Sequence, residues 1–106
     1  MLITGASRGI GAACARAFGG RGDRVAVHYV SDETAATAVH ASLPGTDHTI
    51  VQADLRDPEA VRQMVDRAAT DLGGIDVLVN NAGVFYAHPI QSVSYEVWQQ
   101  AWADTL

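Results

Sequence analysis

Three glycines near the start of the sequence have a spacing suited to binding a phosphate group. Gly5, Gly9 and Gly11 lie in the segment T-G-A-S-R-G-I-G, between a short apolar run and a helical pattern. Glycine permits a positive φ, and it lets a pyrophosphate approach the backbone closely. The free amides and the dipole of a helix that starts here attract an anion. A turn whose glycines serve only packing is the alternative, and the position between strand and helix favours phosphate binding.

The types of basic residue exclude several kinds of phosphate-binding and catalytic site from this chain. All seven are arginine, and the sequence contains no lysine. A phosphate loop of the Walker type requires a lysine, so it is excluded. A Schiff base, or a lysine beside a catalytic tyrosine, is excluded within this chain for the same reason. The net charge of -5 and the scattered arginines argue against a nucleic-acid partner.

The histidines and the single cysteine have no pattern typical of a reactive or metal-binding site. The histidines lack metal-ligand spacing and are interpreted as surface or strand residues. They are His28, His40, His48 and His88. Cys14 lies among alanines, where a small buried thiol is favoured over a reactive one. A lone cysteine forms no internal disulfide, which fits a cytoplasmic protein.

Short apolar runs alternate with longer helical patterns along the chain. The predicted strands cover residues 1–4, 25–30, 49–53 and 75–79. The predicted helices cover residues 9–20, 32–42 and 58–72, and a last helix follows residue 94. Near-continuous apolar strands that alternate with amphipathic helices indicate an α/β protein with a parallel sheet covered on both faces.

The sequence also marks where the helices begin. Ser31 is the predicted N-cap of the second helix, with Asp32 and Glu33 in its first turn facing solvent. Asp57 is the predicted N-cap of the third helix, with Pro58 at its first position. A glycine pair then ends that helix.

The last predicted helix is capped by Ser94. Its apolar face consists of Val97, Trp98, Ala101 and Trp102. The two tryptophans are interpreted as a face that packs on the sheet or on a neighbouring subunit, in preference to a ligand platform.

With two further motifs, the sequence resembles the short-chain dehydrogenase/reductase family, and is closest in style to its 3-oxoacyl reductases and sugar dehydrogenases. Asn80-Asn81-Ala82-Gly83 follows the fourth predicted strand, and Ala53-Asp54-Leu55 follows the third. The resemblance extends over essentially the whole chain. It implies a Rossmann-type sheet in the order 3-2-1-4, truncated after about four strands. Residues 1–106 would then form one partial dinucleotide-binding domain that lacks the catalytic half of the family.

The resemblance assigns cofactor contacts to residues at the ends of the four strands. The glycine-rich turn would surround the adenosine and pyrophosphate, Asp54 would accept a hydrogen bond from the adenine amino group, and the Leu55 amide would meet a ring nitrogen. The Asn-Asn-Ala-Gly segment would line the nucleoside, although a simple turn is the alternative for its asparagines. The implied set is Gly5, Ala6, Ser7, Arg8, Gly9, Ile10, Gly11, Tyr29, Val30, Ser31, Asp54, Leu55, Asn80, Asn81, Ala82 and Gly83.

The residues after the second strand bear on the choice of nicotinamide cofactor. An acid at the end of that strand would bind the ribose hydroxyls of NAD and repel a 2′-phosphate. Tyr29 holds that position and is followed by Val30 and Ser31, so no acid is present there. Arg8 can reach toward a phosphate. The pattern favours NADP over NAD, although a second basic residue that the family often has is missing. Repulsion of the phosphate by Asp32 and Glu33 is the alternative to their facing solvent.

The sequence lacks the catalytic residues that the family requires. The family's proton donor is the tyrosine of a Tyr-x-x-x-Lys motif, but Tyr29, Tyr86 and Tyr95 have no lysine four residues on. The family's active-site asparagine would come just past Leu106. We therefore expect no catalytic residue in this chain and no activity from it alone. The strand at 75–79 would form an apolar edge, which predicts weak stability and a tendency to associate.

The resemblance implies an NAD(P)-dependent oxidoreductase that, when complete, transfers hydride between nicotinamide and a carbonyl or secondary alcohol. It also implies a homo-oligomer. The alternatives are a non-catalytic dinucleotide-binding module and a non-functional gene fragment. No apolar run approaches the roughly 18 residues needed to span a bilayer, and no signal peptide is recognised. We expect no membrane partner.

Overall fold

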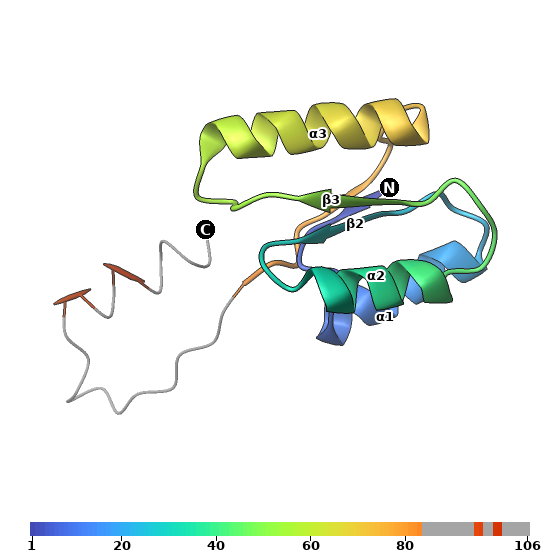
Figure 1. Cartoon of the computed structure of the whole chain (residues 1–106), viewed down its shortest axis with the longest axis horizontal. Helices are drawn as coiled ribbons and strands as arrows, with labels where there is room; N and C mark the ends of the chain where they lie inside the picture. The colour runs from blue at the N-terminus through green and yellow to red at the C-terminus, as the bar shows by residue number, and fades with distance from the viewer. Residues whose placement is uncertain (84–94, 97–98, 101–106) are drawn as a thin grey trace.

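Strands and helices alternate strictly in the part of the chain that the structure, a computed structural model, describes: residues 1–83, 95, 96, 99 and 100 (Figure 1). The strands are β1 (Leu2–Ile3), β2 (Ala26–Tyr29), β3 (Thr49–Gln52) and β4 (Leu78–Val79). The helices are α1 (Gly9–Gly20), α2 (Glu33–Ser42) and α3 (Pro58–Leu72).

The strands form one parallel sheet in the order β3-β2-β1-β4. Leu2 of β1 is in register with Ala26 of β2 on one side and with Leu78 of β4 on the other. The chain builds the sheet outward from β1 to β3 and then returns to the free side of β1. This is the Rossmann-type order that the resemblance implied, so the predicted fold class is confirmed. The carboxyl ends of β1 and β4 meet where the order reverses, which is the usual place for a ligand in such sheets.

Helices cover both faces of the sheet. Figure 1 shows α3 on one face and α1 and α2 on the other. Because successive strand residues point to opposite faces, each strand contributes to both cores. The core under α1 and α2 is Ile3, Ala6, Ala12, Ala15, Val25, Val27, Ala36, Val39 and Leu43. The core under α3 is Leu2, Ala26, Val51, Ala53, Met64, Ala68 and Leu72.

The outer strands are shorter than the apolar runs that predicted them. The fourth run was expected to form a strand over residues 75–79, but β4 contains only Leu78 and Val79. The ladder begins with the Leu2 amide donating to the Val77 carbonyl at 2.9 Å, and it ends with the Thr4 amide donating to Val79 at 3.1 Å. Among the described strands β4 pairs only with β1, and Leu78 is 53% exposed.

One predicted helix cap is wrong and another is confirmed. Ser31 was expected to cap α2, but Asp32 does so, because its Oδ1 accepts from the Ala35 amide at 3.0 Å. Asp32 directly precedes the first helical residue, so its carboxylate reaches the third amide of the helix. Asp57 caps α3 as predicted, with Pro58 at the first position. The cap at Ser94 and the apolar face of the last predicted helix lie outside the described residues.

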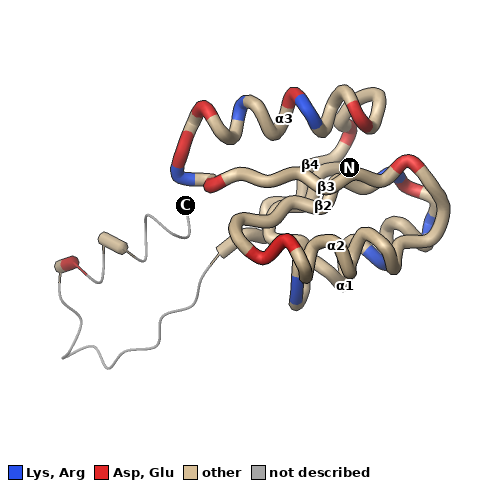
Figure 2. The backbone as a smooth tube through the Cα atoms, in the orientation of Figure 1, with Lys and Arg blue, Asp and Glu red and all other residues tan. Residues whose placement is uncertain are grey.

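Charged side chains lie on the helices and loops, whereas the strands carry none (Figure 2). On α3, Arg62 pairs with Glu59 at 2.6 Å and Arg67 pairs with Asp71 at 3.5 Å. Within the described residues, no helix has the length and apolar character of a membrane span. The same residues contain no group of three or more histidine, cysteine or acidic side chains placed to hold a metal ion.

Candidate functional site

The ends of the four strands bring the residues predicted to bind a ligand to one edge of the sheet. Because all strands are parallel, the segments that follow them emerge on the same side. We call this side the carboxyl edge and define it as residues 4–11, 29–32, 53–56 and 80–83. Every residue that the sequence assigned to the cofactor lies in these four segments.

Two of the three glycines in the first turn are required by packing. Gly5 has a φ of +63°, and a Cβ atom there would lie 2.9 Å from the Ala82 Cα. A Cβ at Gly11 would overlap the carbonyl oxygen of Gly5 and lie 2.6 Å from the Asn81 Nδ2. Gly5 and Gly11 therefore let the turn, the helix and the Asn-Asn-Ala-Gly segment touch. For Gly5 and Gly11, the alternative that the glycines of this turn serve packing therefore applies.

Gly9 is glycine for a different reason. Its φ is +58°, but a Cβ atom there would meet nothing within 4 Å. The left-handed backbone conformation favours glycine, and the space beside it is open. Gly9 is the first residue of α1, so this open space lies at the amino terminus of a helix.

The amino terminus of α1 differs from those of α2 and α3. Arg8 occupies its N-cap position without a side-chain capping bond, and its first turn contains no acid. The Ala12 amide closes the first helical bond, to the Arg8 carbonyl at 3.2 Å. By contrast, Asp32 caps α2 and Asp57 caps α3. Of these three helices, only α1 presents the positive end of its dipole without a carboxylate, which suits an anion.

Thr4 and Asn81 join the first turn to the segment after β4. The Thr4 Oγ1 accepts from the amides of Asn81 and Ala82, both at 3.0 Å, and donates to the Val79 carbonyl at 3.3 Å. The Asn81 Nδ2 donates to the carbonyls of Thr4 and Gly5, both at 3.1 Å. The Asn81 side chain thus holds the glycine-rich turn in place. This is a larger role than that of a simple turn, which was the alternative for the two asparagines. Thr4 was not among the predicted site residues, because a threonine at a strand end is common.

The neighbours of Asn81 are more accessible. Asn80 and Gly83 are exposed, and Ala82 is half-buried against Gly5. In the first turn, Ala6 is fully buried, Ser7 is half-buried, and Ile10 is 76% exposed although it is apolar.

His28 is a strand residue, as one of the two interpretations had it, and it also links two segments of the site. It lies in β2, is fully buried, and uses both ring nitrogens. The Gly5 amide donates to its Nδ1 at 2.9 Å, and its Nε2 lies 2.9 Å from the Ala53 carbonyl oxygen. Burial lowers the pKa of His28 from its ordinary value of 6.5, and the Ala53 carbonyl acts in the opposite direction. Sequence reasoning missed this residue, because its partners are distant along the chain.

Asp54 lies directly after Ala53, and Arg56 fixes its carboxylate. The Asp54 Oδ1 accepts from the backbone amide and the Nε of Arg56, and its Oδ2 accepts from the Nη2 at 2.9 Å. These hydrogen bonds hold the pKa of Asp54 at about 2, well below its ordinary value of 3.8. Leu55 is half-buried and packs against the core under α3. Arg56 was missed, although the spacing Asp-x-Arg could have suggested the pair.

Arg8 and Asp32 approach each other across the ends of β1 and β2. The Arg8 Nη2 lies 3.6 Å from the Asp32 Oδ2, and both side chains are largely exposed. Asp32 was expected to face solvent in the first turn of α2. It instead caps that helix with one oxygen and approaches Arg8 with the other. Tyr29 is half-buried, and Val30 and Ser31 are exposed.

The other described histidines and the cysteine are half-buried and contact other parts of the protein. His40 and His48 are half-buried, and the His40 Nε2 lies 3.0 Å from the His48 carbonyl. Cys14 is half-buried and packs against the core under α1 and α2. His88 and Tyr86 lie outside the described residues, and Tyr95 accepts a hydrogen bond from the Gln99 amide at 2.8 Å.

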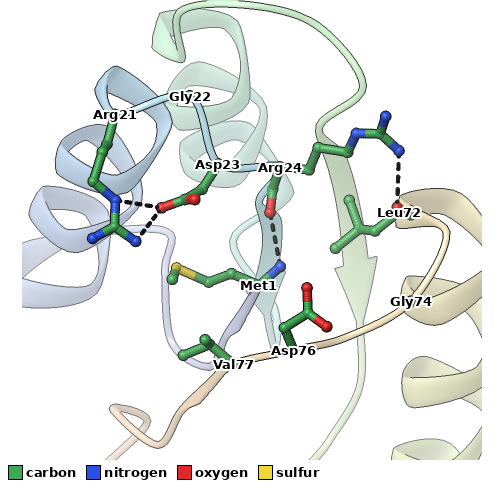
Figure 3. A pocket seen from close by; sticks show the side chains of 9 residues that line it. All are labelled: Met1, Arg21, Gly22, Asp23, Arg24, Leu72, Gly74, Asp76 and Val77. Carbon is green, nitrogen blue, oxygen red and sulfur yellow. Dashed lines mark hydrogen bonds and ion pairs between the residues drawn. The ribbon is translucent and has the colours of Figure 1, made fainter.

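A pocket of about 310 Å³ lies at the opposite, amino-terminal edge of the sheet (Figure 3). Its polar groups bond to one another: Arg21 pairs with Asp23, and Arg24 donates to the Leu72 carbonyl. The amino group of Met1 donates to the Arg24 carbonyl at 2.8 Å. This pocket contains none of the predicted site residues, and it lacks the open helix terminus that favours the carboxyl edge.

Comparisons with known proteins agree with this geometry. The sequence model described as short chain dehydrogenase matches residues 1–104. The 3beta-hydroxysteroid dehydrogenase 1 of Eggerthella lenta is 40% identical over 102 residues, which are 94% of this chain and 39% of that protein. The 3-oxoacyl-[acyl-carrier-protein] reductase of Synechocystis sp. is 40% identical over 100 residues, covering 92% of this chain and 40% of that protein.

A solved structure gives the same result. The short chain dehydrogenase from Burkholderia cenocepacia in complex with NADP superposes with a TM-score of 0.84 at 39% identity, over 97% of this chain and 43% of that one. The chain therefore spans about two fifths of the length of these relatives.

Proposed function

The chain belongs to the short-chain dehydrogenase family, and we propose that its described part is the dinucleotide-binding portion of an NAD(P)-dependent oxidoreductase. The observation that carries the proposal is the uncapped amino terminus of α1, where Gly9 faces open space at the carboxyl edge. A diphosphate fits there, because amides and a helix dipole are available and no carboxylate of α1 competes for them.

The site residues would hold the two halves of the cofactor on either side of this helix. The amides at the start of α1 would bind the diphosphate, and Gly9 would give it access to the backbone. On the β3 side, Asp54 would accept from the adenine amino group, since Arg56 keeps its carboxylate ionised and in place. On the β4 side, the exposed Asn80 and Gly83 would line the nucleoside. The bound nicotinamide would supply or accept the hydride.

We propose NADP as the preferred cofactor. No acid occupies positions 29–31 at the end of β2, and the acid that follows, Asp32, caps α2 with one oxygen and approaches Arg8 with the other. Arg8 is exposed and could exchange its distant contact with Asp32 for a 2′-phosphate, which is a stronger partner. A relative that is 39% identical was solved in complex with NADP, which supports the same choice.

The complete protein would act on a carbonyl or a secondary alcohol. The two relatives named above are equally similar to this chain, yet one is named for a steroid and the other for an acyl-carrier-protein substrate. This fits a cofactor-binding portion shared among enzymes with different substrates. The proposal places the complete protein in the cytoplasm, which the low cysteine content of this sequence supports. It also includes a homo-oligomer, on family resemblance.

A second candidate is a dinucleotide-binding module without catalysis. These 106 residues contain no lysine to partner the family's tyrosine, which fits a non-catalytic role for this chain itself and carries no conclusion about residues outside it. The two candidates share the binding site and differ only in chemistry.

Calorimetric titration of the purified chain with NADPH and NADH, followed by a ketone-reduction assay, tests the proposal. We expect saturable binding, tighter for NADPH, and no turnover by the chain alone. Absence of binding to either nucleotide would refute the binding proposal. Turnover above background that survives repurification would refute the assignment of catalysis to residues outside this sequence.

A further inference from the structure

We propose that His28 is a positioning residue for the cofactor, and that it acts only as the neutral imidazole with its hydrogen on Nε2. In this role it joins the phosphate-binding turn at Gly5 to the adenine side of the site at Ala53. The inference rests on the proposed function, because it assigns a role to His28 in the same binding site.

The two hydrogen-bond partners of the ring determine its tautomer. The Gly5 amide is a donor and lies 2.9 Å from Nδ1, so Nδ1 must accept. The Ala53 carbonyl is an acceptor and lies 2.9 Å from Nε2, so Nε2 must carry the hydrogen. The backbone of His28 adds a third link, because its carbonyl accepts from the Ala6 amide at 2.9 Å.

These contacts place His28 between the two halves of the candidate site. Gly5 is 23 residues away and opens the glycine-rich turn, whereas Ala53 is 25 residues away and directly precedes Asp54. Gly5 is held at its amide by His28 and at its carbonyl by Asn81. The side chains of His28, Asn81 and Thr4 thus hold the turn against the sheet, and of these three only His28 can change its charge near neutral pH.

A core histidine with no role beyond packing would not require this arrangement. The neighbours of His28 on the same face of the sheet include the apolar Ala26 and Val51. An apolar residue at position 28 would fill the space but leave the Gly5 amide and the Ala53 carbonyl without these partners. The imidazole bonds both, at backbone groups that directly adjoin the candidate cofactor contacts.

Protonation would break this link. A second hydrogen on Nδ1 would point at the Gly5 amide hydrogen, so an acceptor would become a donor facing a donor. It would also place a charge at a fully buried position.

Among the residues that the structure describes, no charged side chain forms an ion pair with His28 that could compensate. On the segment after β3, Asp54 is bonded by Arg56, and Asp57 caps α3. On the turn after β1, Arg8 faces Asp32. On β2 itself, the adjacent titratable residue is Tyr29.

The direction of the pH effect follows from the burial of the ring. Because burial lowers the pKa of His28 below 6.5, the folded site retains the neutral ring at pH 7. As the pH falls below 6.5, protonation favours states in which the ring leaves its site. Cofactor affinity and stability should therefore both decrease on acidification through this range, and both should be fully present above it.

The test measures the affinity of the whole chain for NADP⁺ by calorimetry between pH 5 and 8, in the wild type and in His28→Asn. Asparagine can offer an oxygen to the Gly5 amide but does not titrate. We expect His28→Asn to bind about tenfold more weakly at pH 7.5, as for a lost buried hydrogen bond. We also expect its affinity to fall less on acidification than that of the wild type. The 2′-phosphate of NADP⁺ titrates equally in both proteins, so the difference reports on His28.

His48 provides a matched control, because its ring has the same bonding pattern at the opposite edge. Its Nδ1 accepts from the Val25 amide at 3.1 Å, and its Nε2 lies 2.7 Å from the Pro44 carbonyl. His48→Asn should leave the affinity for NADP⁺ and its pH profile unchanged. An equal loss in both variants would overturn the proposal, because it would indicate general destabilisation.

The wild-type chain gives a readout that needs no variant. The ¹⁵N chemical shifts of the imidazole should show the hydrogen on Nε2 and an unprotonated Nδ1 at pH 7.5. A hydrogen on Nδ1, or identical pH profiles for wild type and His28→Asn, would overturn this inference while leaving dinucleotide binding intact. Failure of the wild type to bind NADP⁺ and NAD⁺ would instead refute the proposed function, and this inference with it.

Discussion

Asn81 donates two hydrogen bonds to Thr4, which lies 77 residues earlier in the sequence. The Asn81 amide donates to the Thr4 Oγ1 at 3.0 Å, and the Asn81 side chain donates to the Thr4 carbonyl at 3.1 Å. The Thr4 hydroxyl also accepts from Ala82 and donates to Val79, so its donor and both its acceptor sites are used. These bonds fix the glycine-rich turn to the segment after β4, where the strand order reverses.

Replacing Thr4 with valine should therefore destabilise the fold. The shape is kept, but the amides of Asn81 and Ala82 lose their acceptor at a position only 6% exposed. We expect a loss of about 1–3 kcal/mol in the free energy of unfolding, measured by urea denaturation. Thr4→Ser, which keeps the hydroxyl, should recover most of this loss. Thr49→Val removes an exposed hydroxyl bonded to Asp71, and it should lower the free energy of unfolding by less than Thr4→Val does. A loss for Thr4→Val no larger than for Thr49→Val would contradict this account.

Replacing Asp32 with asparagine tests the role of Arg8 in cofactor choice. Asparagine is a good N-cap, so α2 should remain intact, while the carboxylate that approaches Arg8 is neutralised. We expect the affinity for NADPH to rise by roughly two- to fivefold, as for the release of an exposed ion pair, and that for NADH to change little. Asp57→Asn changes the cap of α3 and the net charge in the same way, but has no contact with Arg8, and serves as the control. An equal change for NADPH and NADH would count against Arg8 as the phosphate ligand.

The hydrogen bonds between Asp54 and Arg56 predict that the stability of the fold changes with pH in the acidic range. Because the folded pKa of Asp54 is about 2 and its ordinary value is 3.8, the pair stabilises the fold above pH 3.8. This contribution is lost as the pH falls from 3.8 toward 2. In Arg56→Gln the pKa of Asp54, followed by the ¹³C shift of its carboxyl carbon, should rise toward 3.8. Arg62→Gln removes an arginine bonded to Glu59 and should leave Asp54 unchanged. An unaltered Asp54 titration in Arg56→Gln would refute the assigned cause.

The fold class could be predicted from the sequence because it depends on local patterns. Apolar runs and helical periodicity are repeated along the chain, and the motif resemblance added the strand order, which the structure confirms. The strand bounds were less accurate: the run at 75–79 is apolar except for Asp76, but only Leu78 and Val79 form strand pairs with β1. The N-cap of α2 was misplaced by one residue because Ser31 and Asp32 are both good caps, and only the helix start distinguishes them.

The candidate site was predicted in outline but not in its internal bonding. The glycine spacing indicated a turn, but it could not separate Gly5 and Gly11, which are needed for packing, from Gly9, which faces open space. His28 gave no signal, because a single histidine in an apolar run does not reveal partners more than twenty residues away on either side. Such contacts depend on sheet register, which side-chain patterns alone do not fix.

The central claim is that a diphosphate binds at the open amino terminus of α1, and Gly9→Ala tests it most directly. Its matched control is Gly73→Ala, because Gly73 also has a left-handed φ, +77°, but ends α3 outside the carboxyl edge. Both changes should cost similar stability, about 1 kcal/mol. Calorimetric titration with NADPH should show a roughly tenfold or greater loss of affinity for Gly9→Ala and none for Gly73→Ala. Wild-type affinity in Gly9→Ala, or equal losses in both variants, would contradict the account.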